Sequence, residues 1–134
     1  MPARQDPADL FESCLPGLVN GDAWLVHRGR FFSGGVGIGI GEVPFHLEIE
    51  RGRVAELKRG RPLKRSTVFR VRADAEAWAK HWRPLPEPHF HDLFALAKAG
   101  RLVLEGELLP VMAHLQYFKD VLAAPRRLGA AERR

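Results

Sequence analysis

Residues 100–122, GRLVLEGELLPVMAHLQYFKDVL, decide how the rest of the chain can fold. Gly100 suits the position just past a helix end, where glycine adopts a positive φ without steric cost. The apolar run at 102–104 is long enough for a buried strand, and Gly106 turns the chain. Glu107 then places a carboxylate at a helix N-terminus, where it interacts favourably with the exposed N–H groups. The stretch therefore predicts a helix end, a strand, a tight turn and a second helix.

The second helix is predicted to run to Leu122 with Pro110 in its first turn, where a helix accepts proline readily. Its apolar residues follow spacings of four, three and four and form one stripe: Val111, Leu115, Phe118 and Leu122. Met112 widens this stripe. A stripe of this kind is more often plain core than the wall of a ligand site, but in either role it must cover an apolar surface.

Composition limits the class of protein. The 134 residues suggest one domain, 1–134, and 46% apolar with 28% charged residues is ordinary for a globular protein. The single cysteine, Cys14, excludes an intramolecular disulfide and fits a reducing cytoplasm, which is the expected location. The first residues lack the apolar core of a secretory signal, and no apolar run approaches the ~20 residues that span a bilayer.

The positive charge is concentrated in one place. The chain carries a net charge of +5, yet residues 51–65 hold seven basic residues and one acidic residue, a local +6, so the remainder is about −1. A solvated hairpin is the commonest role for such a run. The functional alternative is contact with an anionic membrane or headgroup, through Arg51, Arg53, Arg59 and Arg61. Nucleic acid is not expected as a partner, because no aromatic residue is interleaved with these charges.

Residues 1–21 are predicted to form a short helix and a connector. The Asp-Pro pair at 6–7 is a helix-start signal, and the apolar face would hold Leu10, Phe11, Cys14 and Leu18. The Pro-Gly pair at 16–17 is expected to end this helix. The apolar run at 23–26 could form a strand or a packed loop, and the sequence does not decide between them.

Residues 34–41, GGVGIGIG, alternate glycine with β-branched residues. This period of two predicts a strand with Val36, Ile38 and Ile40 on one face and bare backbone on the other. Interior glycines in a strand mark the close approach of something else, here either a helix or chain segment, or a ligand on a face left open. The spacing fits no dinucleotide-binding or phosphate-binding glycine motif, so a nucleotide site is not expected.

Four further strands are predicted, at 45–50, 53–57, 67–72 and 102–105. The first two alternate apolar and polar residues on either side of Arg51 and Gly52, which predicts a hairpin. In the strand at 67–72, the inward positions are Thr67, Phe69 and Val71, and the other face is expected to be partly solvated.

Two helices are predicted before the last strand. Asp74 is a good N-cap for a helix whose apolar face holds Ala75, Trp78, Ala79 and Trp82. Three prolines between 84 and 88 impose an extended connector, and a second helix beginning near Phe90 ends at Gly100. Residues 125–134 hold few apolar side chains and are predicted to form a flexible tail.

No catalytic, metal or cofactor site is expected. His89 and His91 lie near His81 and Asp92, but two residues apart on a helix they would point away from each other. Such residues more often cap a helix or stay solvated. No serine or cysteine nucleophile motif accompanies His114, the one conceivable base. The sequence therefore favours a non-enzymatic protein.

The order of these elements resembles the type 2 sterol carrier protein family. The closing signature of that family, a "gkl.ieGd" strand and turn before an amphipathic helix, stands here as GRLVLEGELLPVM, with Glu107 in place of the more usual aspartate. The glycine-marked hairpin, and the helix pair with tryptophan in its first member, extend the resemblance over roughly residues 30–122. It implies an α+β domain in which a five-stranded mixed sheet, in the order 3-2-1-4-5, carries helices mainly on one face.

The resemblance also implies a function. Members of this family bind fatty acyl chains, acyl-coenzyme A, sterols or phospholipids in an apolar tunnel between sheet and helices. The corresponding ligand-contacting residues here would be Val36, Ile38, Ile40, Trp78, Trp82, Phe94, Val111, Met112, Leu115 and Phe118. The glycine-rich strand departs from the family pattern, and could either enlarge a cavity or let a helix close it. The rival interpretation is an accessory subunit that uses the same fold, without a ligand, to bind a protein partner or a second copy of itself.

Overall fold

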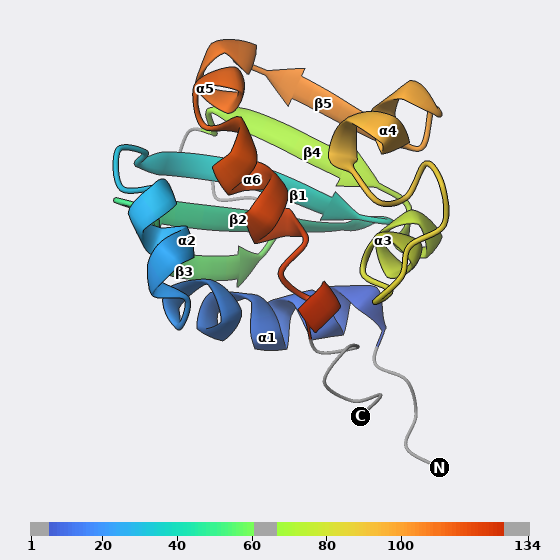
Figure 1. Cartoon of the computed structure of the whole chain (residues 1–134), viewed down its shortest axis with the longest axis horizontal. Helices are drawn as coiled ribbons and strands as arrows, with labels where there is room; N and C mark the ends of the chain where they lie inside the picture. The colour runs from blue at the N-terminus through green and yellow to red at the C-terminus, as the bar shows by residue number, and fades with distance from the viewer. Residues whose placement is uncertain (1–5, 61–66, 128–134) are drawn as a thin grey trace.

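The structure, a computed structural model, describes residues 6–60 and 67–127. Its helices and strands follow the chain in this order: α1 (Pro7–Asn20), α2 (Ala23–Arg28), β1 (Gly34–Ile40), β2 (Val43–Glu50), β3 (Arg53–Arg59), β4 (Phe69–Ala73), α3 (Ala75–His81), α4 (Leu93–Lys98), β5 (Leu102–Gly106), α5 (Leu108–Ala113) and α6 (Leu115–Leu122). Figure 1 shows one twisted sheet with the helices gathered mainly in front of it. This is the α+β arrangement that the sequence predicts.

The sheet has the strand order β3-β2-β1-β4-β5, as the resemblance predicts. β1 lies at its centre, antiparallel to β2 and parallel to β4. The outer pairs, β2 with β3 and β4 with β5, are antiparallel, so the sheet is mixed. All five predicted strands are confirmed, with ends that differ by one or two residues.

Alternation along each strand separates an apolar face from a polar one. At the centre of the sheet Ile38 lies opposite Phe45 on β2 and Val71 on β4, and all three are 1–2% exposed beneath the helices. One residue earlier, Gly37 lies opposite Arg70 on the other face. The helices therefore cover the face that carries the branched and aromatic residues, and leave the face that carries glycine and arginine.

α1 is longer than predicted. It continues through Pro16, although proline inside a helix removes one backbone hydrogen bond. The buried residues lie on both sides of that proline: Ala8, Phe11, Leu15 and Val19. Burial of this whole stripe outweighs the lost bond, so the predicted helix end at 16–17 is wrong. The buried face is also rotated from the predicted one, and Cys14 is only half-buried.

Residues 23–26 belong to α2, so neither the predicted strand nor the packed loop is right. The Asp22 side chain accepts a hydrogen bond from the Leu25 N–H at 3.1 Å, which caps the helix. Leu25 is the buried residue of α2, whereas Trp24 is 82% exposed. The apolar run is thus a short capped helix, and Leu25 is the side chain that it buries in the core.

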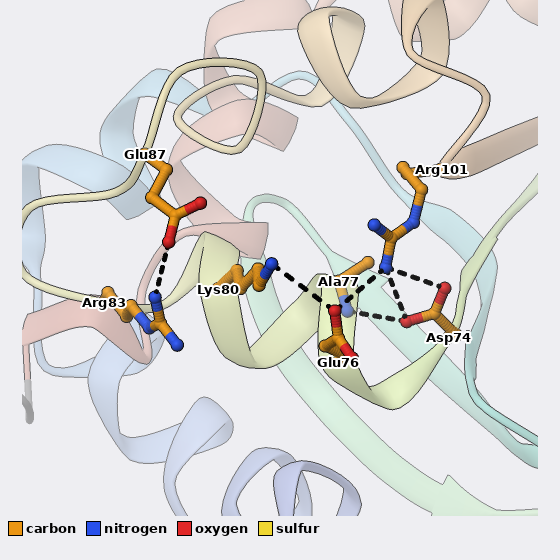
Figure 2. A network of polar contacts seen from close by, with 7 residues as sticks. All are labelled: Asp74, Glu76, Ala77, Lys80, Arg83, Glu87 and Arg101. Atoms are coloured by element: carbon orange, nitrogen blue, oxygen red, sulfur yellow. Dashed lines mark hydrogen bonds and ion pairs between the residues drawn. The ribbon is translucent and has the colours of Figure 1, made fainter.

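α3 begins where the sequence predicts, because the Asp74 carboxylate accepts from the Ala77 N–H at 2.7 Å. Figure 2 shows Arg101, next to β5, reaching across to Asp74 at 3.2 Å and to Glu76 at 3.7 Å. Burial alone would raise the pKa of Asp74, but the hydrogen bonds from Ala77 and Arg101 lower it. The network fastens the start of α3 to the start of β5.

The buried face of α3 differs in part from the prediction. Trp78 is fully buried and Trp82, just past the helix, is 5% exposed, as the pattern indicates. Ala79, however, is exposed, and the remaining buried positions are Ala77 and His81. α4 is followed by Gly100 at a φ of 76°, which confirms the predicted helix end.

The predicted closing helix is in fact two helices. His114, with φ −123° and ψ 33°, leaves the helical conformation between α5 and α6. α6 buries Tyr117, Phe118, Val121 and Leu122, whereas Val111 is the buried residue of α5. Met112 does not widen the buried stripe, because it is 58% exposed. The break lets α6 follow the sheet while α5 turns most of its apolar side chains outward.

Candidate functional site

The residues predicted to contact a ligand lie on the helix-covered face of the sheet or in the helices over it. Seven of them are exposed by 5% or less: Val36, Ile38, Ile40, Trp78, Trp82, Val111 and Phe118. Phe94 and Leu115 are partly buried, and Met112 is exposed. The seven buried residues belong to one hydrophobic core. The structure thus brings most of the predicted set together, but as packed side chains.

Aromatic rings fill the space beneath the junction of α5 and α6. The Phe118 ring meets Phe32 at 4.9 Å and Phe69 at 4.8 Å between centroids, both edge to face. His114 stands 5.6 Å from Phe32 in the same geometry. Edge-to-face pairs are a favourable arrangement of aromatic quadrupoles. We refer to Phe32, Phe69 and Phe118 as the aromatic floor.

A second aromatic cluster joins α1 to the end of α3. The Trp82 ring stacks on Trp78 at 5.3 Å and on Phe11 at 5.9 Å. The Trp78 indole N–H donates to the Gly39 carbonyl at 2.8 Å, and that of Trp82 donates to the Leu122 carbonyl at 2.7 Å. Because both buried indole groups have a partner, these tryptophans fasten α3 to β1 and to α6.

α5 differs from the other elements around the aromatic floor. Val111 is 4% exposed, but three large apolar side chains of the same short helix point to solvent: Leu108 (52%), Leu109 (83%) and Met112 (58%). We call these three residues the α5 rim. A helix of six residues with one buried side chain, next to a break at His114, loses little buried surface when it moves. It is therefore the least firmly packed element of this region.

The sequence pattern did not identify two residues of this region. Tyr117 is 1% exposed; its hydroxyl donates to the Gly52 carbonyl at 2.7 Å, and burial raises its pKa. The single four-three-four stripe left it out because that stripe assumed one continuous helix across His114. Phe32 is 5% exposed. No local signal could have found it, because its neighbour Phe31 has the same residue type and is 78% exposed.

The helix-free face of the sheet carries a groove of about 320 Å³, lined in part by Gly37, Gly39, Arg70, Arg72 and Glu105. The arginines explain the glycines. A Cβ atom on Gly37 would lie 2.8 Å from the Arg70 Cγ, and one on Gly39 would lie 2.7 Å from the Arg72 Cβ. The close approach that the glycines indicate is therefore made by side chains of β4, which is the chain-segment alternative of the prediction and not the helix.

The basic hairpin is not one uniform patch. Arg59 pairs with Asp9 at 2.9 Å and with Glu12 at 2.8 Å, so it joins β3 to α1. Arg51 and Arg53 are exposed at the other end of the strand. Arg61 lies outside the described residues. Among the predicted headgroup contacts, Arg51 and Arg53 are the ones that the structure leaves available.

The histidines do not gather into a metal site. In residues 6–60 and 67–127 there is no group of three or more histidine, cysteine, aspartate or glutamate side chains that could hold a metal ion. His81 is 1% exposed and its Nδ1 lies 2.7 Å from the Phe90 carbonyl. Burial is the main cause that lowers its pKa to about 4, so it is neutral at pH 7 and joins α3 to the connector.

The ends of the described chain add two facts. Of the predicted tail, residues 125–127 are described, and the Arg126 guanidinium donates to the His81 carbonyl at 2.7 Å. Residues 128–134 lie outside the described part. Over the stretches that the structure describes, no helix combines the length and apolarity needed to cross a bilayer.

Comparisons of sequence give no relatives: no family model and no curated protein matches the chain. Solved structures do match. A conserved hypothetical protein of Thermus thermophilus, described as a candidate sterol carrier protein, gives a TM-score of 0.68 at 15% identity over 94% of this chain and 90% of that one. A crystal structure of sterol carrier protein 2 gives 0.67 at 17% identity, over 92% and 95%. The ubiquinone synthesis protein UbiJ-SCP2 gives 0.57 at 15% identity, over 94% and 98%. The chain therefore has the sterol carrier protein 2 fold.

Proposed function

We propose that this chain binds and carries, without chemical change, an apolar or amphiphilic lipid-like molecule such as a fatty acyl chain or a sterol. The ligand would lie between the sheet and the C-terminal helices, against the aromatic floor. The observation that carries this proposal is the α5 rim: three exposed apolar side chains on a short helix that ends at His114, whose ring meets the buried Phe32 of the aromatic floor. The fold shared with a structure named sterol carrier protein supports it.

Access would require α5 to swing away from the sheet at His114. The main loss is the burial of Val111, worth about 1.5–3 kcal/mol for a side chain of this kind. A hydrocarbon chain that takes its place gains about 0.8 kcal/mol for each methylene buried. A few methylenes on the aromatic floor therefore offset the opening of α5. In this scheme the α5 rim would meet the apolar part of the ligand first.

The test is uptake of a fluorescent fatty acid by the purified chain, together with native mass spectrometry of lipid that co-purifies. Val111→Trp should fill the space under α5 and weaken uptake, at a stability cost of about 1–3 kcal/mol for overpacking. Val111→Phe is the milder form if the larger side chain prevents folding. Circular dichroism confirms that each variant is folded before uptake is measured.

A matched pair of exposed leucines tests the rim. Leu109 is 83% exposed on α5, and Leu85 is 88% exposed in the connector after α3. Neither substitution to serine should change stability by more than about 0.5 kcal/mol, but only Leu109→Ser should weaken uptake. Equal uptake by wild type and both Val111 variants would refute a site under α5.

The alternative is that the α5 rim binds a protein partner or a second copy of the chain instead of a ligand. The exposure of Leu108, Leu109 and Met112 favours this as well, because apolar patches on a folded chain often mark interfaces. Native mass spectrometry separates the two. A stoichiometric protein partner or dimer that is lost in Leu109→Ser, with no bound lipid, would support the alternative.

A further inference from the structure

Two aromatic side chains are far more exposed than a folded chain requires. Trp24, in α2, is 82% exposed, and Phe31, just after α2, is 78% exposed. The other two tryptophans, Trp78 and Trp82, are 0% and 5% exposed. Large aromatic rings contribute most to stability when they are buried, so a Trp and a Phe held in solvent at one end of the molecule call for a partner surface.

The segment that carries these rings is held firmly around the turn between β2 and β3. On one side, the Asn20 side chain donates to the Val54 carbonyl at 3.0 Å and accepts from the Val54 N–H at 2.8 Å. On the other side, the Gly52 N–H donates to the Phe32 carbonyl at 3.2 Å. Figure 1 shows α2 beside this end of the sheet, at the left of the view. The rings therefore project from a fixed base rather than from a loose loop.

The same turn supplies positive charge. The Arg51 N–H donates to the Ser33 hydroxyl at 2.9 Å, which places Arg51 close to the segment that follows α2. Arg53 is the next residue but one, and Arg30 lies over the Phe31 ring at 4.4 Å. None of these three arginines forms an ion pair with a carboxylate of the described residues. We call Trp24, Phe31, Arg30, Arg51 and Arg53 the aromatic–basic surface.

Among the residues that the structure describes, three acidic groups are linked to this part of the molecule by strand pairing or by an ion pair. Glu50 lies opposite Arg53 in the β2–β3 pairing. Asp22 is paired with Arg127 at 2.9 Å, and Asp120 with Arg28, so these two carboxylates are neutralised by their own partners. Three arginines against one glutamate leave the surface positive.

We propose that the aromatic–basic surface docks the chain on an anionic lipid bilayer. Aromatic side chains settle at the boundary between headgroups and acyl chains, and arginines beside them meet the headgroup phosphates. A nucleic acid is less suited to this surface, because base stacking needs an open ring face and the Arg30 guanidinium covers one face of Phe31. This surface shares no residue with the α5 rim, and the proposal stands without it.

The experiment is flotation of the purified chain with vesicles of phosphatidylcholine, with and without phosphatidylserine. The chain should float with the anionic vesicles, much less with the neutral ones, and less again as salt is raised. Because Trp24 is the exposed tryptophan, its emission should shift to the blue and resist aqueous quenchers when vesicles are added. Trp24→Ala should remove that shift and weaken binding about tenfold. Removing Arg51 or Arg53 should weaken binding about fivefold for each charge lost.

Two matched controls come from elsewhere in the chain. Leu85→Ala removes an exposed apolar side chain, and Arg70→Ala removes an exposed arginine on the helix-free face of the sheet. Both should bind vesicles as the wild type does. Because all these positions are exposed, each variant should fold, and its circular dichroism confirms this.

The proposal is overturned if the wild type fails to float with anionic vesicles at low salt, or if Trp24→Ala and Arg51→Ala bind as well as the controls. It is also overturned if the same variants instead abolish binding of single-stranded oligonucleotide, or concentration-dependent self-association, while vesicle binding is absent. Fatty acid uptake measured in parallel keeps this result apart from the carrier function. Loss of docking with intact uptake refutes only the docking surface, and the reverse refutes only the carrier.

Discussion

The two faces of β1 offer the clearest contrast in the molecule. On one face Val36, Ile38 and Ile40 are 1–2% exposed under the helices. On the other face, arginine side chains from β4 lie against the bare backbone of Gly37 and Gly39. Seven consecutive residues thus serve as hydrophobic core and as support for charged side chains at the same time. The contrast shows that glycine in a central strand can be required by an arginine neighbour as readily as by a helix or a ligand.

The parallel register between β1 and β4 produces this arrangement. Gly37 is paired with Arg70, and Gly39 with Arg72. The Arg72 Nε then donates to the Glu105 carboxylate at 2.7 Å, so its side chain lies across the sheet. A side chain on Gly39 would displace the first carbon of that arginine. The face under the helices is closed to water. On the opposite face, Arg70 and Arg72 leave no room for a Cβ atom at Gly37 or Gly39.

The largest expected effect comes from making space on the helix-covered face. Ile38→Ala removes a side chain that is 2% exposed and should lower the free energy of unfolding by about 2–5 kcal/mol. Arg70→Ala, on the neighbouring strand β4 and on the opposite face of the sheet, should change it by less than about 0.5 kcal/mol. Urea denaturation followed by tryptophan fluorescence measures both. Similar losses for the two variants would show that the faces are not energetically distinct.

The next effect is the pH dependence of stability that the burial of His81 causes. Its pKa is lowered from 6.5 to about 4 in the folded chain, so only the unfolded chain takes up this proton between those values. Stability should therefore be complete above about pH 6.5 and fall as the pH drops towards 4, by about 3 kcal/mol in total. His81→Asn keeps a donor near Nδ1 and should flatten this part of the stability profile. A wild-type profile already flat between pH 6.5 and 4 would contradict burial of a neutral histidine.

The smallest expected effect separates the two glycines of the arginine-bearing face. Gly39→Ala should cost about 1–3 kcal/mol, because the new Cβ meets the Arg72 Cβ, which is fixed to the backbone. Gly37→Ala should cost less, because it meets the Arg70 Cγ, which can rotate away. Thermal unfolding of each variant compares them.

Double variants give this comparison its control. Arg70→Ala removes the Cγ and should restore the stability of Gly37→Ala. Arg72→Ala keeps the Cβ and should leave Gly39→Ala as unstable as before. Rescue in both cases, or in neither, would show that the arginine side chains do not account for the glycines.

Much of the sheet could be predicted from the sequence, because its signals are local. Alternation places Val36, Ile38 and Ile40 on one face whatever surrounds them. The turn at Arg51 and Gly52 adopts positive φ at both positions, 50° and 83°, as a two-residue hairpin turn requires. The helices were less predictable, because their buried faces depend on what they meet. The continuation of α1 past Pro16 depends on burial against the core, a tertiary effect that no local signal reports.

The burial of most of the candidate ligand-contacting residues was predictable, but the course of the helices that carry them was not. The stripe through Val111 and Phe118 is correct, yet its spacing cannot show that the helix breaks at His114. Trp24 belongs to an apolar run, which by itself indicates burial. Its exposure follows from the short helix that begins after the Asp22 cap, and the sequence did not predict that helix. Which side chains a short helix turns outward depends on its angle to the sheet, and a single sequence does not contain that angle.

The break at His114 also divides the C-terminal region into two parts that should open independently. α6 is fastened at Tyr117 to the Gly52 carbonyl and at Leu122 to the Trp82 indole. α5 has Val111 as its buried anchor. Amide hydrogens of α5 should therefore exchange with solvent through brief local openings. Those of α6 should exchange only when the whole domain unfolds. Under the proposed carrier function, such openings would admit and release a ligand many times while the domain as a whole stays folded.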